Sequence, residues 1–168
     1  LELFPSEYIH IGGDEAPKMQ WKACSVCQNT IKTNNLKDEH ELQSWFVHQM
    51  DDFLTKKGRK LLGWDEILEG GLSPNAAVMS WQGSAGGLTA AQQQHEVVMT
   101  PNDYCYFDYY QGNRALEPHS IGGMVTLEKV FNFNPIPNGL HNTNYKYIKG
   151  GQANLWTEYI ANPKKVEY

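Results

Sequence analysis

Five short segments rich in β-branched and aromatic residues recur along the chain, and their spacing limits the possible folds. They are residues 7–11, 60–64, 76–81, 96–100 and 151–156. Helical periodicity is strongest at 39–57, before Gly58, and helices are also expected near 88–94 and 126–133. A strand–connection–strand order repeated in this way predicts an α/β fold with a parallel sheet.

Acidic and aromatic residues follow the ends of the expected strands. In a (β/α)8 TIM barrel, the carboxyl ends of the strands carry the active site. A complete barrel takes about 250 residues, so the sequence predicts a partial barrel of about five βα units. A doubly wound sheet is the alternative, but the sequence contains no glycine-rich phosphate loop that would favour it.

Charge and hydropathy exclude two classes of partner. The net charge is −5 and Lys and Arg form no cluster, so nucleic-acid binding is not expected. Apolar runs stay well short of the roughly 20 residues that a membrane helix needs, so membrane insertion is not expected either. The chain opens at Leu1 without a starting Met or a signal peptide, and we expect it to be part of a longer protein.

Cys24 and Cys27 form an isolated CxxC motif. A structural zinc site needs four ligands, and the spacing of His40 and His48 from the pair fits no familiar finger. A redox CxxC is expected at a strand-to-helix junction, whereas this one is assigned to a polar loop after Trp21. The sequence therefore favours two thiols or a local disulfide, with no metal and no cofactor.

The segment His10-Ile11-Gly12-Gly13-Asp14-Glu15 is the strongest motif. Its two glycines allow a tight turn after the strand, and its adjacent carboxylates can point differently into one pocket. A solvated turn or a helix N-cap is the alternative interpretation of such an acidic pair. The segment resembles the HxGGDE signature of the glycoside hydrolase family 20 β-N-acetylhexosaminidases. Further similarities follow in the family's order at residues 63–66, 80–83, 106–108 and 155–158.

The resemblance implies that residues 1–168 are the C-terminal portion, about the last five βα units, of a TIM-barrel glycoside hydrolase catalytic domain. The implied reaction hydrolyses terminal non-reducing N-acetyl-D-hexosamine (GlcNAc or GalNAc) from β-linked glycoconjugates with retention. The substrate's own 2-acetamido oxygen attacks the anomeric carbon and forms an oxazolinium ion. Glu15 is then the general acid, Asp14 the carboxylate that stabilises the acetamido nitrogen, and Tyr106 the hydroxyl donor to the acetamido oxygen.

The same resemblance implies the substrate-binding residues. Trp64, Trp81 and Trp156 are expected to wall the pocket around the acetamido methyl and the sugar face. Asp108 and Glu158 are expected to accept hydrogen bonds from sugar hydroxyls.

Other residues receive supporting roles or none. His10 is expected to support the strand end, and Asp65 and Glu66 to be structural. The family's arginine for hydroxyls 3 and 4 belongs to an earlier strand, and neither Arg59 nor Arg114 replaces it. We therefore expect the isolated chain to be inactive and to self-associate through uncovered strand edges.

Two other functions are compatible with parts of this sequence. A non-catalytic carbohydrate-binding module needs aromatic faces and acceptors, but not an acid beside a charge stabiliser. A metalloprotein using Asp14, Glu15 and Glu158 lacks a recognisable ligand cluster. The family suggests a periplasmic, secreted or lysosomal-type compartment.

Overall fold

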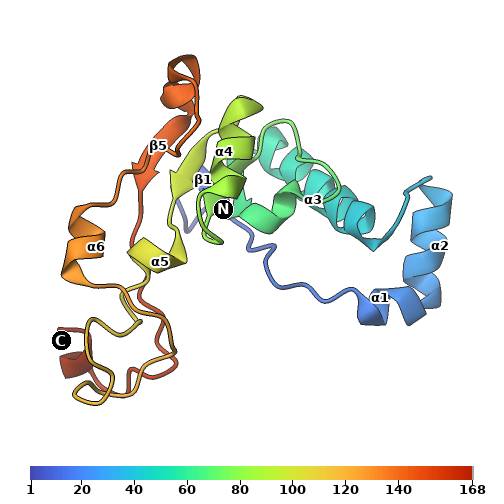
Figure 1. Ribbon diagram of the computed structural model, residues 1–168. Helices are drawn as coiled ribbons and strands as arrows, with labels where there is room; N and C mark the ends of the chain where they lie inside the picture. Colours follow the sequence, from blue (N-terminus) through green and yellow to red (C-terminus); the bar gives the residue numbers. More distant parts are fainter. Residues whose placement is uncertain (168) are drawn as a thin grey trace.

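The computed structural model describes residues 1–167, and its centre is a five-stranded parallel sheet. The strands follow one another in space as in sequence (Figure 1): β1 (Tyr8–His10), β2 (Lys60–Trp64), β3 (Ala77–Ser80), β4 (Val97–Met99) and β5 (Ile148–Gly151). Every neighbouring pair is parallel. A parallel sheet in sequential order is a barrel wall, so the predicted partial (β/α)8 barrel is confirmed.

The connections hold the helices. They are α1 (Met19–Ala23), α2 (Ser25–Thr33), α3 (Glu39–Lys56), η1 (Asp65–Leu68), α4 (Ala85–Gln92), α5 (Asn102–Cys105), α6 (Leu127–Phe131), η2 (Asn142–Tyr147) and η3 (Pro163–Lys165). The predicted long helix is therefore present as α3. It begins where the Asp38 carboxylate accepts hydrogen bonds from the His40 and Glu41 N–H groups, and Gly58 follows its end with φ +68°.

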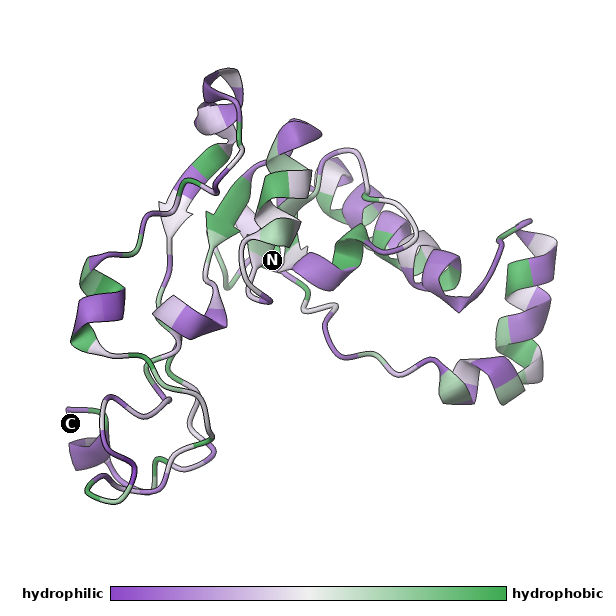
Figure 2. Cartoon of the chain, in the orientation of Figure 1, coloured by the Kyte–Doolittle hydropathy of each residue, from purple (hydrophilic) through white to green (hydrophobic). Residues whose placement is uncertain are grey.

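Residues alternate between the two faces of the sheet. One face packs against α3 and α4 through an apolar layer that includes Leu61, Val78 and Val97. The other face carries Leu62, Trp64, Ala77 and Met79. Figure 2 shows hydrophobic colour along the strands and on α4. The second face corresponds to the interior of the barrel and leads toward the strand ends.

No helix within residues 1–167 is both long and apolar enough to cross a lipid bilayer.

The strand predicted at 151–156 is wrong in its position. β5 begins at Ile148 and ends at Gly151. The Gln152 N–H still donates to the Met99 carbonyl (2.9 Å), but β4 has ended at Met99 and the chain turns into α5. Residues 152–156 therefore lose their neighbouring strand. Their remaining pairing is an isolated bridge between Asn154 and Tyr106.

The polar loop predicted around Cys24 and Cys27 is also wrong. Cys24 caps α2, and Cys27 lies in the first turn of that helix. The segment is polar in composition, so its helix was not expected. This helix contacts α3, and its residue Ile31 is buried.

Candidate active site

A strained turn carries Asp14 and Glu15. Directly after β1 the backbone is left-handed at Gly12 (φ +75°), Gly13 (φ +101°) and Glu15 (φ +46°). Glycine adopts such angles without steric cost, whereas a glutamate adopts them only at a steric cost. Strain of this kind persists only where the surroundings fix the backbone, and it is common at functional sites. Asp14 and Glu15 are both exposed at this turn.

Contacts on two sides fix the turn. The Trp64 N–H donates to the Gly12 carbonyl (2.9 Å). The buried Gln43 side chain donates to the Gly13 carbonyl (2.7 Å) and accepts from the Lys18 ammonium. A Cβ atom at Gly13 would lie 2.6 Å from Cγ2 of Ile67. Only glycine fits here, so the direction of the two carboxylates is set by the fold.

Two of the predicted tryptophans flank the turn at neighbouring strand ends. Trp64 is the last residue of β2, and Trp81 follows β3 directly. The Trp81 indole N–H donates to Glu66 Oε2 (2.9 Å), which fixes the ring plane. The Trp81 ring meets the Tyr106 ring edge-on, with centroids 6.2 Å apart.

Tyr106 is buried among aromatic rings. Its ring stacks on Tyr109 (5.6 Å between centroids) and lies 6.3 Å from the Trp156 ring. Burial raises the pKa of Tyr106 to about 12, and the charge of Asp108 adds to the effect. The phenol therefore keeps its proton at every physiological pH and can act as a hydrogen-bond donor.

Asp108 has an unsatisfied carboxylate. Both oxygens are shielded from solvent, and neither makes a hydrogen bond of normal geometry within the described chain, although the Asp108 and Trp156 backbone N–H groups lie close enough to lower the pKa of Asp108. Burial raises the pKa of Asp108, and the nearby Glu158 charge acts in the same direction. A buried acceptor pair whose nearby donors are poorly aligned is costly. Donor groups of a ligand would remove that cost.

Trp156 and Glu158 close the other side. Both lie in the segment that leaves the sheet after β5, and both are exposed. Trp156 remains 43% exposed although its ring approaches Trp64 (6.0 Å). An indole face this accessible can stack on a ligand.

These residues line a single cleft of about 320 Å³. It contains eight of the nine predicted site residues: Asp14, Glu15, Trp64, Trp81, Tyr106, Asp108, Trp156 and Glu158. The volume lies within the roughly 300–1,000 Å³ typical of small-molecule sites. Side chains at or beyond the ends of all five strands, from segments far apart in sequence, therefore converge on one space.

His10 is the predicted residue outside the cleft lining. Its ring contacts Trp64 edge-on (4.8 Å), and its Nδ1 accepts the Gly12 N–H (3.0 Å). Burial lowers the pKa of His10, although the charge of Asp14 opposes this. The ring therefore contacts both the turn and Trp64.

Sequence reasoning missed four residues that line the cleft: Tyr109, Ile121, Gly122 and Gly123. Gly123 has φ +52°, and a Cβ there would lie 2.0 Å from Cδ2 of Tyr109. The adjacent glycines are the one signal in the sequence that could have indicated such a close approach.

Asp65 and Glu66 are placed behind the cleft. Glu66 holds Trp81, and its other oxygen accepts from Gln82 (3.1 Å). Asp65 is buried and accepts the Ser80 hydroxyl (3.2 Å). Burial and the neighbouring Glu66 charge raise the pKa of Asp65 to about 6.

A larger cavity of about 370 Å³ adjoins the cleft and shares five lining residues with it: Asp108, Tyr109, Ile121, Trp156 and Glu158. Its remaining lining is mostly apolar and includes neither Asp14 nor Glu15. Asp14 and Glu15 therefore line the smaller cleft and not the larger cavity.

Comparison with known proteins agrees with this geometry. Over residues 1–168 the chain matches the family described as glycosyl hydrolase family 20, catalytic domain. The chain belongs to this family. It is 53% identical over 167 residues to a β-hexosaminidase of Porphyromonas gingivalis, covering 99% of this chain and 22% of that protein.

Solved structures place this family 20 chain in the same fold. An exo-β-N-acetylglucosaminidase of Vibrio harveyi, in complex with N-acetylglucosamine, superposes with a TM-score of 0.84 at 32% identity. The match covers 99% of this chain and 27% of that chain. A chitobiase of Flavobacterium johnsoniae gives a TM-score of 0.74 at 34% identity, over 94% and 23% of the two chains. The chain thus spans about a quarter of the length of these relatives.

Proposed function

We propose that this chain is the C-terminal portion of the catalytic domain of a β-N-acetylhexosaminidase. The parent enzyme would remove terminal non-reducing N-acetylhexosamine from β-linked glycoconjugates. The observation that carries the proposal is the convergence of an acidic pair, a protonated tyrosine, an unsatisfied carboxylate and three tryptophans on one cleft. The names of its relatives, which include β-hexosaminidases, support the substrate class.

In this proposal the two carboxylates of the turn do different work. Glu15 protonates the leaving glycosidic oxygen and later removes a proton from water, a type of transfer worth roughly 10²–10⁴ in rate. Asp14 stays ionised, accepts the acetamido N–H and stabilises the positive charge that develops on that nitrogen. The bond to the leaving oxygen breaks as the acetamido oxygen bonds the anomeric carbon, and water then opens the oxazolinium ion with net retention.

The aromatic side of the cleft orients the acetamido group. Tyr106 keeps its proton because its pKa is raised to about 12, so its hydroxyl can donate to the acetamido oxygen. Trp64, Trp81 and Trp156 present ring faces to the acetamido methyl and the sugar. Asp108, whose oxygens lack partners, and Glu158 would accept hydrogen bonds from sugar hydroxyls.

A cyclic analogue of the intermediate tests the proposal. A thiazoline derived from N-acetylglucosamine should inhibit the full-length parent strongly, and Tyr106→Phe should weaken that inhibition. Glucosides without the 2-acetamido group should not be hydrolysed. Equal turnover of N-acetylglucosaminides and of glucosides without the 2-acetamido group would contradict the mechanism. Sugar binding without any turnover would favour a carbohydrate-binding module.

The isolated chain is proposed to be inactive and to self-associate. β1 and β5 are the edges of the described sheet, and each has one unpaired side. Exposed apolar side chains, such as Leu3 (87%) and Phe131 (85%), add surface that favours association. Light scattering at low micromolar concentration should detect dimers or larger species. A stable monomer would contradict self-association, and turnover by this chain that Glu15→Gln abolishes would contradict inactivity.

We also propose that the parent works in a periplasmic, secreted or lysosomal-type compartment, as the family suggests.

A further inference from the structure

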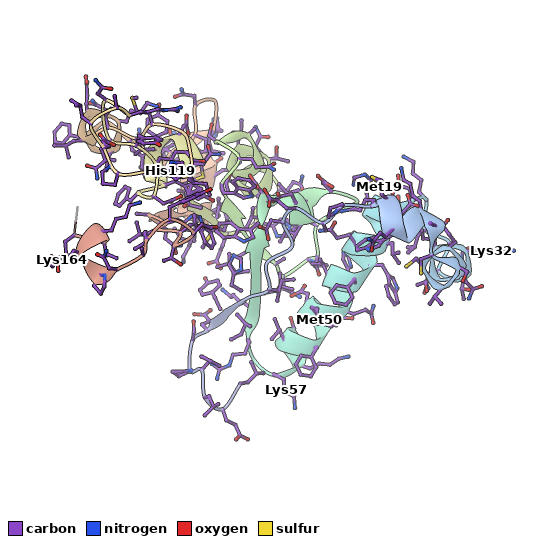
Figure 3. The ribbon with its side chains drawn as sticks, turned by 90° about the horizontal axis from the view of Figure 1, so that it is seen from below. Met19, Lys32, Met50, Lys57, His119 and Lys164 are labelled. Atoms are coloured by element: carbon purple, nitrogen blue, oxygen red, sulfur yellow. The ribbon has the colours of Figure 1, made fainter. Side chains whose placement is uncertain are left out.

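Cys24 and Cys27 lie outside the cleft, in the α1–α2 unit that the proposed hydrolysis does not use. Figure 1 shows this unit beyond α3, joined to the sheet by the long segment after β1. Figure 3 shows Met19 and Lys32, which belong to α1 and α2, at the opposite end of the molecule from His119 and Lys164. Any chemistry of these thiols is therefore separate from the sugar site.

The two cysteines are placed for bond formation. Cys24 is the N-cap of the nine-residue helix α2, and its sulfur accepts the Cys27 N–H (3.4 Å). Residues three apart on a helix have Cα atoms roughly 5 Å apart, and cysteines in disulfides have Cα atoms roughly 4.4–6.8 Å apart. Cys24 has an extended backbone (φ −83°, ψ 115°). Its sulfur can therefore approach Cys27 without breaking the helix.

The environment makes the two thiols unequal. The hydrogen bond from the Cys27 thiol lowers the pKa of Cys24, and the Cys27 and Val26 backbone N–H groups add to the effect. The same side-chain hydrogen bond raises the pKa of Cys27. Thiolates, and not thiols, attack disulfides. The Cys24 sulfur also accepts a backbone N–H at the N-terminus of α2, a position that stabilises a thiolate. Cys24 is therefore assigned as the nucleophile and Cys27 as the second thiol to react.

Exposure separates the pair from the third cysteine. Cys24, Cys27 and Cys105 are all free thiols, but Cys24 and Cys27 are partly exposed, whereas Cys105 is buried (5% exposed). Burial raises the pKa of Cys105 to about 11. Cys105 is thus an internal control that should not react.

We propose that Cys24 and Cys27 form a reversible dithiol–disulfide pair that exchanges with low-molecular-weight disulfides of the glutathione class. The Cys24 thiolate attacks one sulfur of the external disulfide, the S–S bond breaks, and one thiol leaves. Cys27 then loses its proton and attacks the Cys24 sulfur, which expels the second thiol. Two protein thiols are oxidised, and one external disulfide is reduced to two thiols.

Mass spectrometry of the trypsin-digested chain tests the proposal. Cleavage after Lys22 and Lys32 gives one peptide that holds both cysteines, and Cys105 lies in another. The full chain is equilibrated in glutathione buffers from fully reduced to fully oxidised, quenched in acid and alkylated. The first peptide should appear as an unalkylated disulfide in oxidised buffer and as a doubly alkylated dithiol in reduced buffer, while Cys105 stays a thiol. Unchanged thiols in every buffer, or a disulfide that excess reduced glutathione does not open, would overturn the proposal.

Serine variants assign the two roles. Cys27→Ser should trap one glutathione on Cys24, because no second thiol can expel it. Cys24→Ser keeps an N-cap side chain, and Cys27 should then react at least roughly tenfold more slowly than Cys24 does in Cys27→Ser. Cys105→Ser should behave as the wild type. Faster reaction of Cys27 than of Cys24, or a trapped mixed disulfide in the wild type, would contradict the proposed roles. If a variant does not fold, the wild-type peptide decides alone.

Discussion

The acidic turn (residues 12–15) and the aromatic wall (Tyr106, Asp108, Trp156 and Glu158) form opposite sides of one cleft, but they are built differently. The turn is continuous in sequence, and its shape follows from glycines in left-handed conformations. The wall combines two irregular segments about 50 residues apart in sequence. The two segments are joined by the bridge between Tyr106 and Asn154. The Phe107 N–H donates to the Asn154 carbonyl, and the Asn154 N–H donates to the Cys105 carbonyl (both 2.8 Å).

The two sides of the cleft are therefore held in place in different ways. The turn has a strained backbone, and contacts from Trp64, Gln43 and Ile67 hold it in one conformation. Long-range hydrogen bonds and burial fix the wall, since β4 and β5 have ended before it begins. We therefore expect single substitutions in the turn to have larger effects than single substitutions at the wall.

The short helix η1 supports both sides. Ile67 in η1 fills the space beside Gly13, and Glu66 in η1 holds Trp81, which meets Tyr106. Variants in or against η1 therefore show how strongly the two sides are coupled.

The largest effect is expected at Glu15. In the full-length parent, Glu15→Gln should lower kcat on oligosaccharides by roughly 10²–10⁴, because it removes the proton donor but keeps the side-chain shape. Aryl glycosides with good leaving groups need less protonation and should lose less, which provides an internal control. Steady-state kinetics on both substrates measure the difference. Wild-type rates on oligosaccharides would refute the assignment of Glu15.

A smaller effect is expected from Gly13→Ala. The new methyl would meet Ile67 Cγ2 at 2.6 Å, at a residue with φ +101°. We expect this variant to lose about 2–3 kcal/mol of unfolding free energy, from backbone strain plus overpacking. Gly83→Ala is the matched control, because Gly83 has φ +97° and its Cβ would meet nothing within 4 Å.

Urea unfolding of the two variants gives the comparison. The loss of unfolding free energy in Gly83→Ala should reflect backbone strain alone. The additional loss in Gly13→Ala should then reflect the clash with Ile67 in η1. Equal losses would mean that η1 does not constrain the turn.

The smallest effect is expected from Asp65→Asn, and it depends on pH. Burial raises the pKa of Asp65 from about 3.8 to about 6, so the folded protein binds this proton more tightly than the unfolded chain does. Stability should therefore fall as pH rises from about 4 to about 6 and then level off. Asparagine carries no charge, so the variant should be about 1–2 kcal/mol more stable than the wild type at pH 8.

Urea unfolding of both proteins at several pH values measures the difference. The gain should shrink toward zero near pH 4. A gain that does not change with pH would mean that the ionisation of Asp65 is not its cause.

The sequence predicted the elements whose signals are local. The alternating apolar residues of β2 and β3, the periodicity of α3 and the glycines of the turn all act over a few neighbouring residues, and each was placed within one or two residues of its position in the structure. The five-strand order followed from their spacing. The resemblance to family 20 then supplied the site residues, which spacing alone could not assign.

Tertiary structure decided the features that depend on distant partners. Residues 152–156 leave the sheet because β4 has already ended, which the composition of that segment does not encode. Tyr109 lines the cleft because Gly123, fourteen positions later, leaves room for its ring. Residues 25–33 form α2 in contact with α3, with Ile31 buried, although the polar composition of the segment indicated a loop. In each case the deciding contact joins residues that local propensity cannot connect, so the fold had to supply it.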